Sequence, residues 1–296
     1  MTYPDSLPAS GNSTSYQALV AAHERYLRQL HAIVQIDLRG RPIGDWLPYA
    51  LFVHILQLGR AVQTLVAAGF PDEALPLTRA MISAMMNLLF IVTSGNPNGW
   101  ALRYWLQLGE MEQRFLAREL KRMRFDEATV RKLIDEAGQN VAGAKSQAAR
   151  EGVQLPDKIA ASDRGQPRMD TWTGLSDRAL AERVGQVDAY ETEYDYASAI
   201  THVQAVALKP IANALIEGKA VGTGPYFGPP LPAIGSSYNA SSAALLGIAK
   251  HFGLADKLPD IDVVTKEMRD AIDHWRDVSG TNEQITSIFG DRIPPA

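Results

Sequence analysis

The sequence predicts an all-α protein built as a single helical bundle, with long antiparallel helices and appended C-terminal helices. Apolar residues recur at the spacing of a helix face through most of the chain, while the alternating pattern of a strand is nearly absent. Residues that start and end helices recur between these segments. The connections between successive helices are short, which favours antiparallel packing of neighbours.

Five helices are expected in the first half of the chain. Gly69 ends the second, because glycine readily adopts the left-handed conformation of a C-terminal cap. Pro71 opens the third, since proline fits the first turn of a helix, and Asp126 is expected to cap the fifth. The first four span residues 15–37, 45–69, 71–93 and 97–122, and the fifth fades within residues 137–152.

The second half is expected to hold a loop, a short helix and three longer helices. Ser176 can cap the short helix, and Pro210 is expected to kink the long one by removing a backbone donor. The expected segments are a loop over 152–175, helices over 176–184 and 187–217, a Pro/Gly-rich connection over 218–235, and helices over 237–252 and 260–278. Residues 1–14 are expected to be disordered, and residues 15–290 to form one domain.

Composition indicates a soluble cytoplasmic protein. The 296 residues carry 29 basic and 33 acidic side chains, for a formal net charge of −4, which argues against a surface that is basic all over and binds nucleic acid. There is no cysteine, so disulfides and cysteine-ligated metals are excluded. No signal-peptide pattern is visible, and the apolar run 81–92 is too short to span a bilayer. We expect no membrane contact.

Three polar residues of the long helix 187–217 are candidate ligand-binding residues. Tyr194, Ser198 and His202 are each separated by four residues and therefore project from nearly the same helix face. The ordinary pKa of histidine lies near neutral pH, which suits binding or proton transfer. No oxyanion-hole or nucleophile motif accompanies Ser198. The alternative is a buried polar row that only holds helices together.

Two arginines complete the set of ligand-binding candidates. Arg79 lies on the apolar helix 71–93, where a guanidinium must pair or reach water, because burying it alone is prohibitive. Arg103 lies near the start of the next helix. Such an arginine could bind a carboxylate or a phosphate bidentately. Structurally, Arg79 could instead pair with Asp195 or Glu191.

The segments that carry these residues resemble a family of bacterial helical proteins of unknown function, DUF5677. The similarity covers roughly residues 45–210, and its most specific part is the ordered set Arg79, Tyr194, Ser198 and His202. Family members tend to carry Glu four residues after the arginine that opens the apolar helix, whereas this chain has Ser83. The resemblance implies a helical fold and carries no established activity. Its segments are 74–92, 100–115 with Arg103 followed by Tyr104, and 172–202.

Three functions remain open on sequence grounds, and the sequence does not decide whether the protein is an enzyme. The first is a non-catalytic protein that binds a small molecule or a protein partner in a polar pocket between helices 71–93 and 187–217. The second is a metal-independent, HEPN-like ribonuclease in stress or phage defence, with an Arg25/His31 pair. Its RNA-binding candidates are Arg114, Arg118, Lys121 and Arg122, a basic stripe at helical spacing.

The third function is a structural bundle that assembles with a partner through a surface rich in methionine. Met81, Met85 and Met86 would form that surface. A homodimer is possible under any of the three functions. The six histidines form no recognised ligand motif, so we expect no bound metal, and we expect no cofactor.

Overall fold

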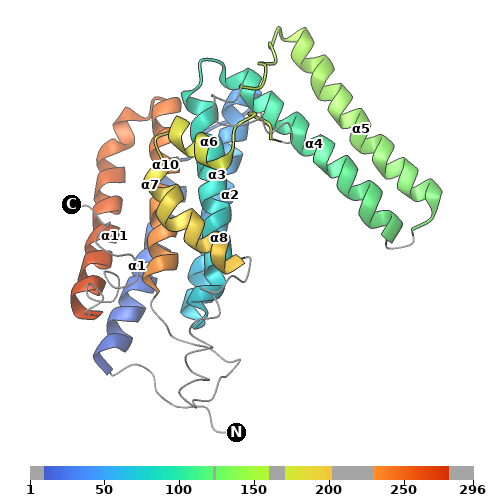
Figure 1. Cartoon of the computed structure of the whole chain (residues 1–296). Helices are drawn as coiled ribbons and strands as arrows, with labels where there is room; N and C mark the ends of the chain where they lie inside the picture. The colour runs from blue at the N-terminus through green and yellow to red at the C-terminus, as the bar shows by residue number, and fades with distance from the viewer. Residues whose placement is uncertain (1–9, 123–124, 160–170, 202–229, 280–296) are drawn as a thin grey trace. The chain divides into compact units, whose positions relative to one another are not determined.

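The structure is a computed structural model that describes residues 10–122, 125–159, 171–201 and 230–279 (Figure 1). The described residues form helices and no strand, which confirms the all-α prediction. The helices are α1 (Ser10–Ile33), α2 (Ile43–Ala67), α3 (Pro71–Thr93), α4 (Pro97–Arg122), α5 (Glu127–Arg150), α6 (Asp177–Arg183), α7 (Val187–Ala189), α8 (Asp195–Thr201), α10 (Leu231–His251) and α11 (Leu258–Ser279). A π-helical turn, η1 (Tyr190–Tyr194), joins α7 to α8, and a 3-10 turn, η2 (Ala255–Lys257), precedes α11.

Local capping explains where several helices begin and end. Asp126 accepts a hydrogen bond from the backbone N–H of Thr129 at 2.9 Å, and Ser176 accepts one from Ala179 at 3.2 Å, so both residues are N-caps as predicted. Gly69 has φ +85 and lies just beyond the end of α2, where the left-handed conformation favours glycine. Helices α3 and α4 begin at prolines and span the predicted residues.

Several boundaries differ from the prediction. Helix α1 runs from Ser10 to Ile33 and not over residues 15–37, and α2 begins and ends two residues earlier than expected. Helix α5 continues to Arg150 instead of fading. Helix α10 begins at Leu231, so Gly235 is a helical residue and the connection ends earlier than expected. Pro230 and Pro232 account for the early start, since proline fits the N-terminal positions of a helix. The expected kink at Pro210 lies outside the described residues, as do residues 202–217 of the long helix.

The chain divides into two compact units. The first contains residues 1–36, 51–86 and 186–296, and the second contains residues 37–50 and 87–185. In the first unit, α1 packs along α11 and α10. In the second, α4 and α5 form an antiparallel hairpin, with Leu102, Leu106 and Ala148 buried between them. The prediction of one domain over residues 15–290 stays a prediction.

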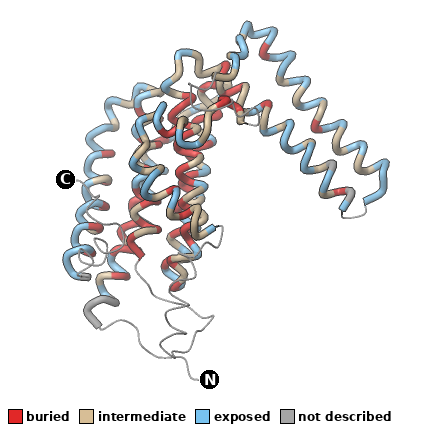
Figure 2. The backbone as a smooth tube through the Cα atoms, in the orientation of Figure 1, coloured by how far each residue is buried: buried red, intermediate tan, exposed pale blue. Residues whose placement is uncertain are grey.

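Helix α3 is the most apolar part of the core. Met81, Ile82, Met85, Met86, Leu88 and Ile91 are each at most 1% exposed, and Figure 2 shows the helix buried along much of its length. A helix that is apolar on nearly all sides is stable only when other elements surround it. The expected methionine-rich surface is therefore wrong, because Met81, Met85 and Met86 are core residues.

Helices α2 and α3 are both long and apolar enough to cross a membrane. The same length and composition occur in the core helices of bundles, and 61% of the most apolar window of α3 is buried within the protein. Helix α2 is only 39% buried in its window, but it exposes the polar side chains of His54, Gln57, Arg60 and Thr64. The expected lack of membrane contact stays a prediction.

A buried polar seam joins α1 to α10. His23 is 0% exposed, and its Nε2 lies 3.0 Å from the hydroxyl of Ser237. The hydroxyl of Tyr26 lies 2.6 Å from that of Ser242. Nδ1 of His23 is buried and has no hydrogen-bond partner among the described residues. Burial lowers the pKa of His23 to about 4, because the charged imidazolium would lose its hydration.

This low pKa predicts a loss of stability in mild acid. Below pH 6.5 the unfolded chain binds a proton at His23, whereas the folded protein does not bind it until the pH approaches 4. The free energy of unfolding should therefore fall by about 2 kcal/mol between pH 7 and pH 5 because of this residue. Urea denaturation at several pH values should show that the free energy of unfolding depends less on pH in His23→Gln than in the parent. His54→Gln, an exposed change on α2, should keep the parental slope, and parallel curves for parent and His23→Gln would contradict the assignment.

Candidate functional site

Arg79 and Tyr194 are two of the predicted site residues, and the structure brings them into contact. The Nη2 atom of Arg79 donates a hydrogen bond to the hydroxyl of Tyr194 at 3.0 Å. The guanidinium carbon also lies 4.9 Å from the centre of the tyrosine ring, which places a cation against its electron-rich face. Arg79 is half-buried on α3 and Tyr194 is 4% exposed, so the contact is partly shielded from water.

The π-helical turn η1 presents Tyr194 to Arg79. Tyr190 and Tyr194 stack with their ring centres 4.9 Å apart and their planes at 20°. The side chains of Arg79, Tyr194 and Tyr190 thus form a continuous row, which we call the arginine–tyrosine row. Single π-helical turns are rare and often lie at functional sites. The turn places the ring of Tyr194 against Arg79 and stacks it on Tyr190.

Arg79 forms no ion pair with an acidic side chain among the described residues, and its Nε atom is buried without an acceptor. Glu191, in the π-helical turn, and Asp195, at the start of α8, are the acids suggested by the sequence, and both are exposed. The segment 202–229 contains a single acid, Glu217. Among the described residues, the contacts found for the guanidinium of Arg79 are with the ring and hydroxyl of Tyr194.

The remaining ligand-binding candidates are not brought to this row. Ser198 lies on α8, one turn after Tyr194, and is half-buried. His202 lies outside the described residues, so its expected proximity to Arg79 stays a prediction. Arg103 belongs to the second unit, where its Nε donates to the backbone carbonyl of Pro156 at 2.6 Å. A hydrogen bond to a loop carbonyl fixes the position of that loop and is not evidence of a ligand.

Glu193 is a polar residue of the π-helical turn that sequence reasoning missed. Its Oε1 accepts a hydrogen bond from Asn239 of α10 at 2.6 Å, while its Oε2 is buried and without a partner among the described residues. Burial raises the pKa of this carboxyl group above its ordinary value. Glu193 lies between Thr192 and Tyr194, and nothing in the sequence distinguishes it from an exposed helical glutamate.

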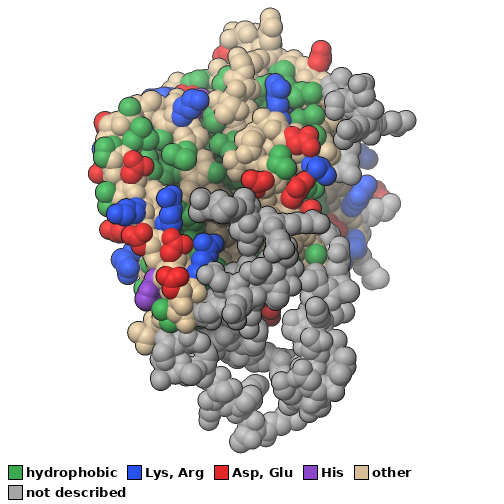
Figure 3. Space-filling view, turned by 60° about the vertical axis from the view of Figure 1, so that its left-hand side comes forward, with side chains coloured by type: hydrophobic (Ala, Val, Ile, Leu, Met, Phe, Trp, Pro, Cys, Tyr) green, Lys and Arg blue, Asp and Glu red, His purple; other side chains and the backbone are tan. Residues whose placement is uncertain are grey.

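The basic residues of α4 lie on an open helix surface. Arg114, Arg118 and Arg122 are exposed, and Arg122 forms an ion pair with Glu119 at 2.7 Å. The side chain of Lys121 lies outside the described residues. Arg25 and His31, the other pair of the ribonuclease hypothesis, are exposed on α1. Acidic and basic side chains also intermix on the face seen in Figure 3, which shows no extended area of one sign.

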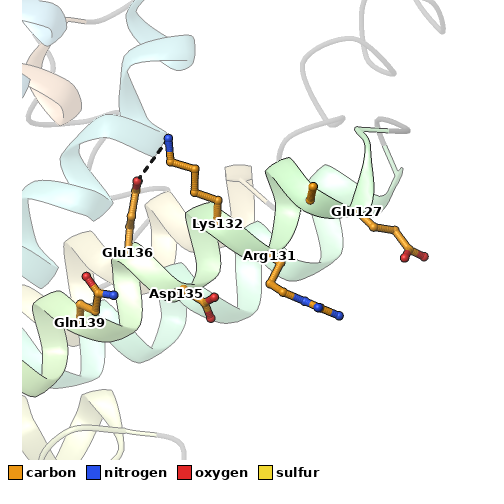
Figure 4. Close-up of a pocket in the computed structure, with 7 residues that line it drawn as sticks. Glu127, Arg131, Lys132, Asp135, Glu136 and Gln139 are labelled. Atoms are coloured by element: carbon orange, nitrogen blue, oxygen red, sulfur yellow. Dashed lines mark ion pairs between the residues drawn. The ribbon is translucent and has the colours of Figure 1, made fainter.

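A shallow hollow along α5 is a charged helix surface and not a binding site. All the residues that line it come from α5 itself, and their side chains point outward from one helix (Figure 4). Lys132 and Glu136 form an ion pair at 3.8 Å, one turn apart. Pairs of this kind on an exposed helix are common and contribute little energy.

The fold and the arginine–tyrosine row define an all-helical protein with a partly buried cation, Arg79, that has no acidic partner in the described part of the chain. Residues 45–214 match a family described as "Family of unknown function (DUF5677)". The match covers more than half of the chain and includes Arg79, Tyr194, Ser198 and His202. The chain belongs to the DUF5677 family, and the resemblance found in the sequence is confirmed. No curated protein and no solved structure matches the chain.

The contact between Arg79 and Tyr194 predicts a measurable coupling energy. Tyr194→Phe keeps the ring but removes the acceptor for Nη2, and a hydrogen bond to a charged group contributes about 1.5–3 kcal/mol. The variant should therefore lose stability in chemical denaturation. In an Arg79→Met background the same change should cost much less, because the donor is already gone. Equal losses in both backgrounds would show that the hydrogen bond contributes nothing to stability.

Proposed function

We propose that this protein is a non-catalytic cytoplasmic binding protein, and that Arg79 holds a carboxylate or phosphate group of a small molecule or protein partner. The observation that carries the proposal is the buried Nε of Arg79, which has no acceptor among the described residues. The arginine–tyrosine row would form one wall of the binding site, and Ser198 and His202 are the nearest candidates along the chain for further hydrogen bonds.

A partly buried charge without a counter-charge costs free energy. A guanidinium that is partly removed from water loses hydration energy, and a buried N–H without an acceptor adds the desolvation cost of that donor. A bound anion would offset both the lost hydration of the charge and the missing acceptor of Nε, because carboxylates and phosphates accept two parallel hydrogen bonds from an arginine. The stacked tyrosines hold the guanidinium in place beforehand, which lowers the entropy lost on binding.

The ribonuclease alternative has less support. The arginines of α4 are exposed, but acidic Glu110 and Glu112 are exposed on the same helix and Glu119 pairs with Arg122. Contacts with phosphate groups need several cations that act together. RNA binding and homodimer formation stay predictions.

Anion-dependent stability tests the proposal. Phosphate or acetate should raise the thermal midpoint of the parent above its value in chloride at equal ionic strength, because a ligand of the folded state adds RT ln(1 + [L]/Kd) to its stability. At ten times the Kd this amounts to about 1.4 kcal/mol. Arg79→Gln should abolish the effect.

The matched control is Arg60→Gln, which removes an exposed arginine from α2 of the same unit. This variant should keep the parental response to phosphate. If the Arg79 and Arg60 variants both respond like the parent, the anion binds elsewhere and the proposed site is wrong.

A further inference from the structure

Four aromatic side chains pack together in the second unit. Phe90 meets Trp100 at 5.0 Å and Trp172 at 5.2 Å between ring centres, and both pairs are nearly perpendicular. Tyr104 meets Trp172 at 5.1 Å in the same edge-to-face manner. This arrangement is favoured because the positive edge of one ring faces the negative face of another. These edge-to-face contacts hold the four rings in a fixed arrangement. We call Phe90, Trp100, Tyr104 and Trp172 the aromatic wall.

Asn87 holds two of these rings by hydrogen bonds. Its Oδ1 accepts a hydrogen bond from the indole Nε1 of Trp172 at 3.1 Å, and its side chain also bonds the hydroxyl of Tyr104. The half-buried amide of Asn87 thus forms hydrogen bonds with two of the four aromatic side chains, Trp172 and Tyr104. A wall held by hydrogen bonds as well as by packing keeps its shape when a ligand approaches.

A cavity of about 230 Å³ is lined in part by Phe90 and Trp100. It is bounded by the end of α3, the start of α4, the loop that precedes residue 160, and α6. The loop is fixed locally, because Ile159 donates its N–H to the carbonyl of Thr173 at 2.8 Å. Gly174, at φ +83, passes so close to Ile159 that a Cβ atom would lie 2.6 Å from its carbonyl oxygen. The main lining residues are Phe90, Thr93, Ser94, Trp100, Ile159 and Arg183.

The lining combines apolar and aromatic side chains with one exposed cation. Arg183 is the single charged residue among those that line the cavity, and it is exposed on the last turn of α6. The hydroxyls of Thr93 and Ser94 donate to the carbonyls of Leu89 and Ile91, at 2.7 and 2.8 Å, so they can only accept further hydrogen bonds. A ligand for this cavity would be flat and apolar over most of its surface and negative at one end.

We infer that this cavity is a binding site for a small aromatic acid, with its ring against Phe90 and Trp100 and its carboxylate at Arg183. The volume is below the range of about 300–1,000 Å³ for sites of drug-sized ligands, so it suits a single ring system. This site shares no residue with the arginine–tyrosine row and goes beyond the function proposed above. It gives the protein a second class of ligand, small aromatic acids, whose ring would pack against the aromatic wall.

Benzoate and benzyl alcohol are the probes, since they share a ring and differ in charge. Saturation-transfer NMR and calorimetry on the full chain should show benzoate binding more tightly than the alcohol. Arg183→Gln should weaken benzoate binding by up to about fivefold, the upper end for an exposed ion pair, and leave binding of the alcohol unchanged. The control is Arg178→Gln on the same helix, which removes an arginine that faces Glu182 at 3.4 Å and does not line the cavity.

Nuclear Overhauser contacts from the benzoate ring to the indole of Trp100 should locate the ligand without any substitution. Arg79→Gln should leave benzoate binding unchanged. Benzoate that fails to bind, that binds the Arg183→Gln variant with parental affinity, or that contacts other residues overturns the inference. Binding that is lost in Arg79→Gln and kept in Arg183→Gln would also overturn it while supporting the arginine–tyrosine row.

Discussion

The desolvation of charge on helix α3 is the constraint on which the account of this protein depends. The helix supplies Met81, Met85, Leu88 and other fully buried side chains to the core, so its surroundings must be apolar. Arg79 lies in the same helix and is half-buried. A cation in such a place must find acceptors, and the structure provides the hydroxyl and ring of Tyr194 but no acid among the described residues. The proposed function follows from this guanidinium, whose Nη2 has a hydrogen-bond acceptor while its buried Nε has none among the described residues.

Each candidate site has an arginine and aromatic rings among its residues, and the two sites lie in different units of the chain. Arg79 lies against Tyr194, which stacks on Tyr190, and Arg183 stands at the rim of a cavity walled by Phe90 and Trp100. Aromatic walls are rigid, lose little entropy on binding and tolerate an adjacent guanidinium. The two arginines differ in burial. Because Arg79 is partly removed from water, its electrostatic attraction for a bound anion should be stronger than that of the exposed Arg183.

Local signals made the helix boundaries predictable, whereas contacts between distant segments were not. The starts of α3 and α4 follow from Pro71 and Pro97, and the cap at Ser176 follows from a single side chain. The contact between Arg79 and Tyr194 spans 115 positions of sequence, and a π-helical turn has no distinct sequence pattern, so its geometry could not be foreseen. Periodicity also cannot say whether an apolar methionine faces the core or a partner, which is why the methionine-rich surface was expected wrongly. The aromatic wall joins Phe90, Trp100 and Trp172 from three segments and has no local signature either.

The most direct measurement is nitrogen-15 NMR of the Arg79 side chain during a phosphate titration at constant ionic strength. The Nε–H resonance can be assigned by its disappearance in Arg79→Lys. If the buried Nε lacks an acceptor and binds an anion, this resonance should shift as phosphate is added, and its hydrogen exchange should slow in a saturable manner. The Nε–H resonance of Arg60 should stay constant. An Arg79 resonance that is unaffected by phosphate, and that is already protected without it, would contradict the central claim.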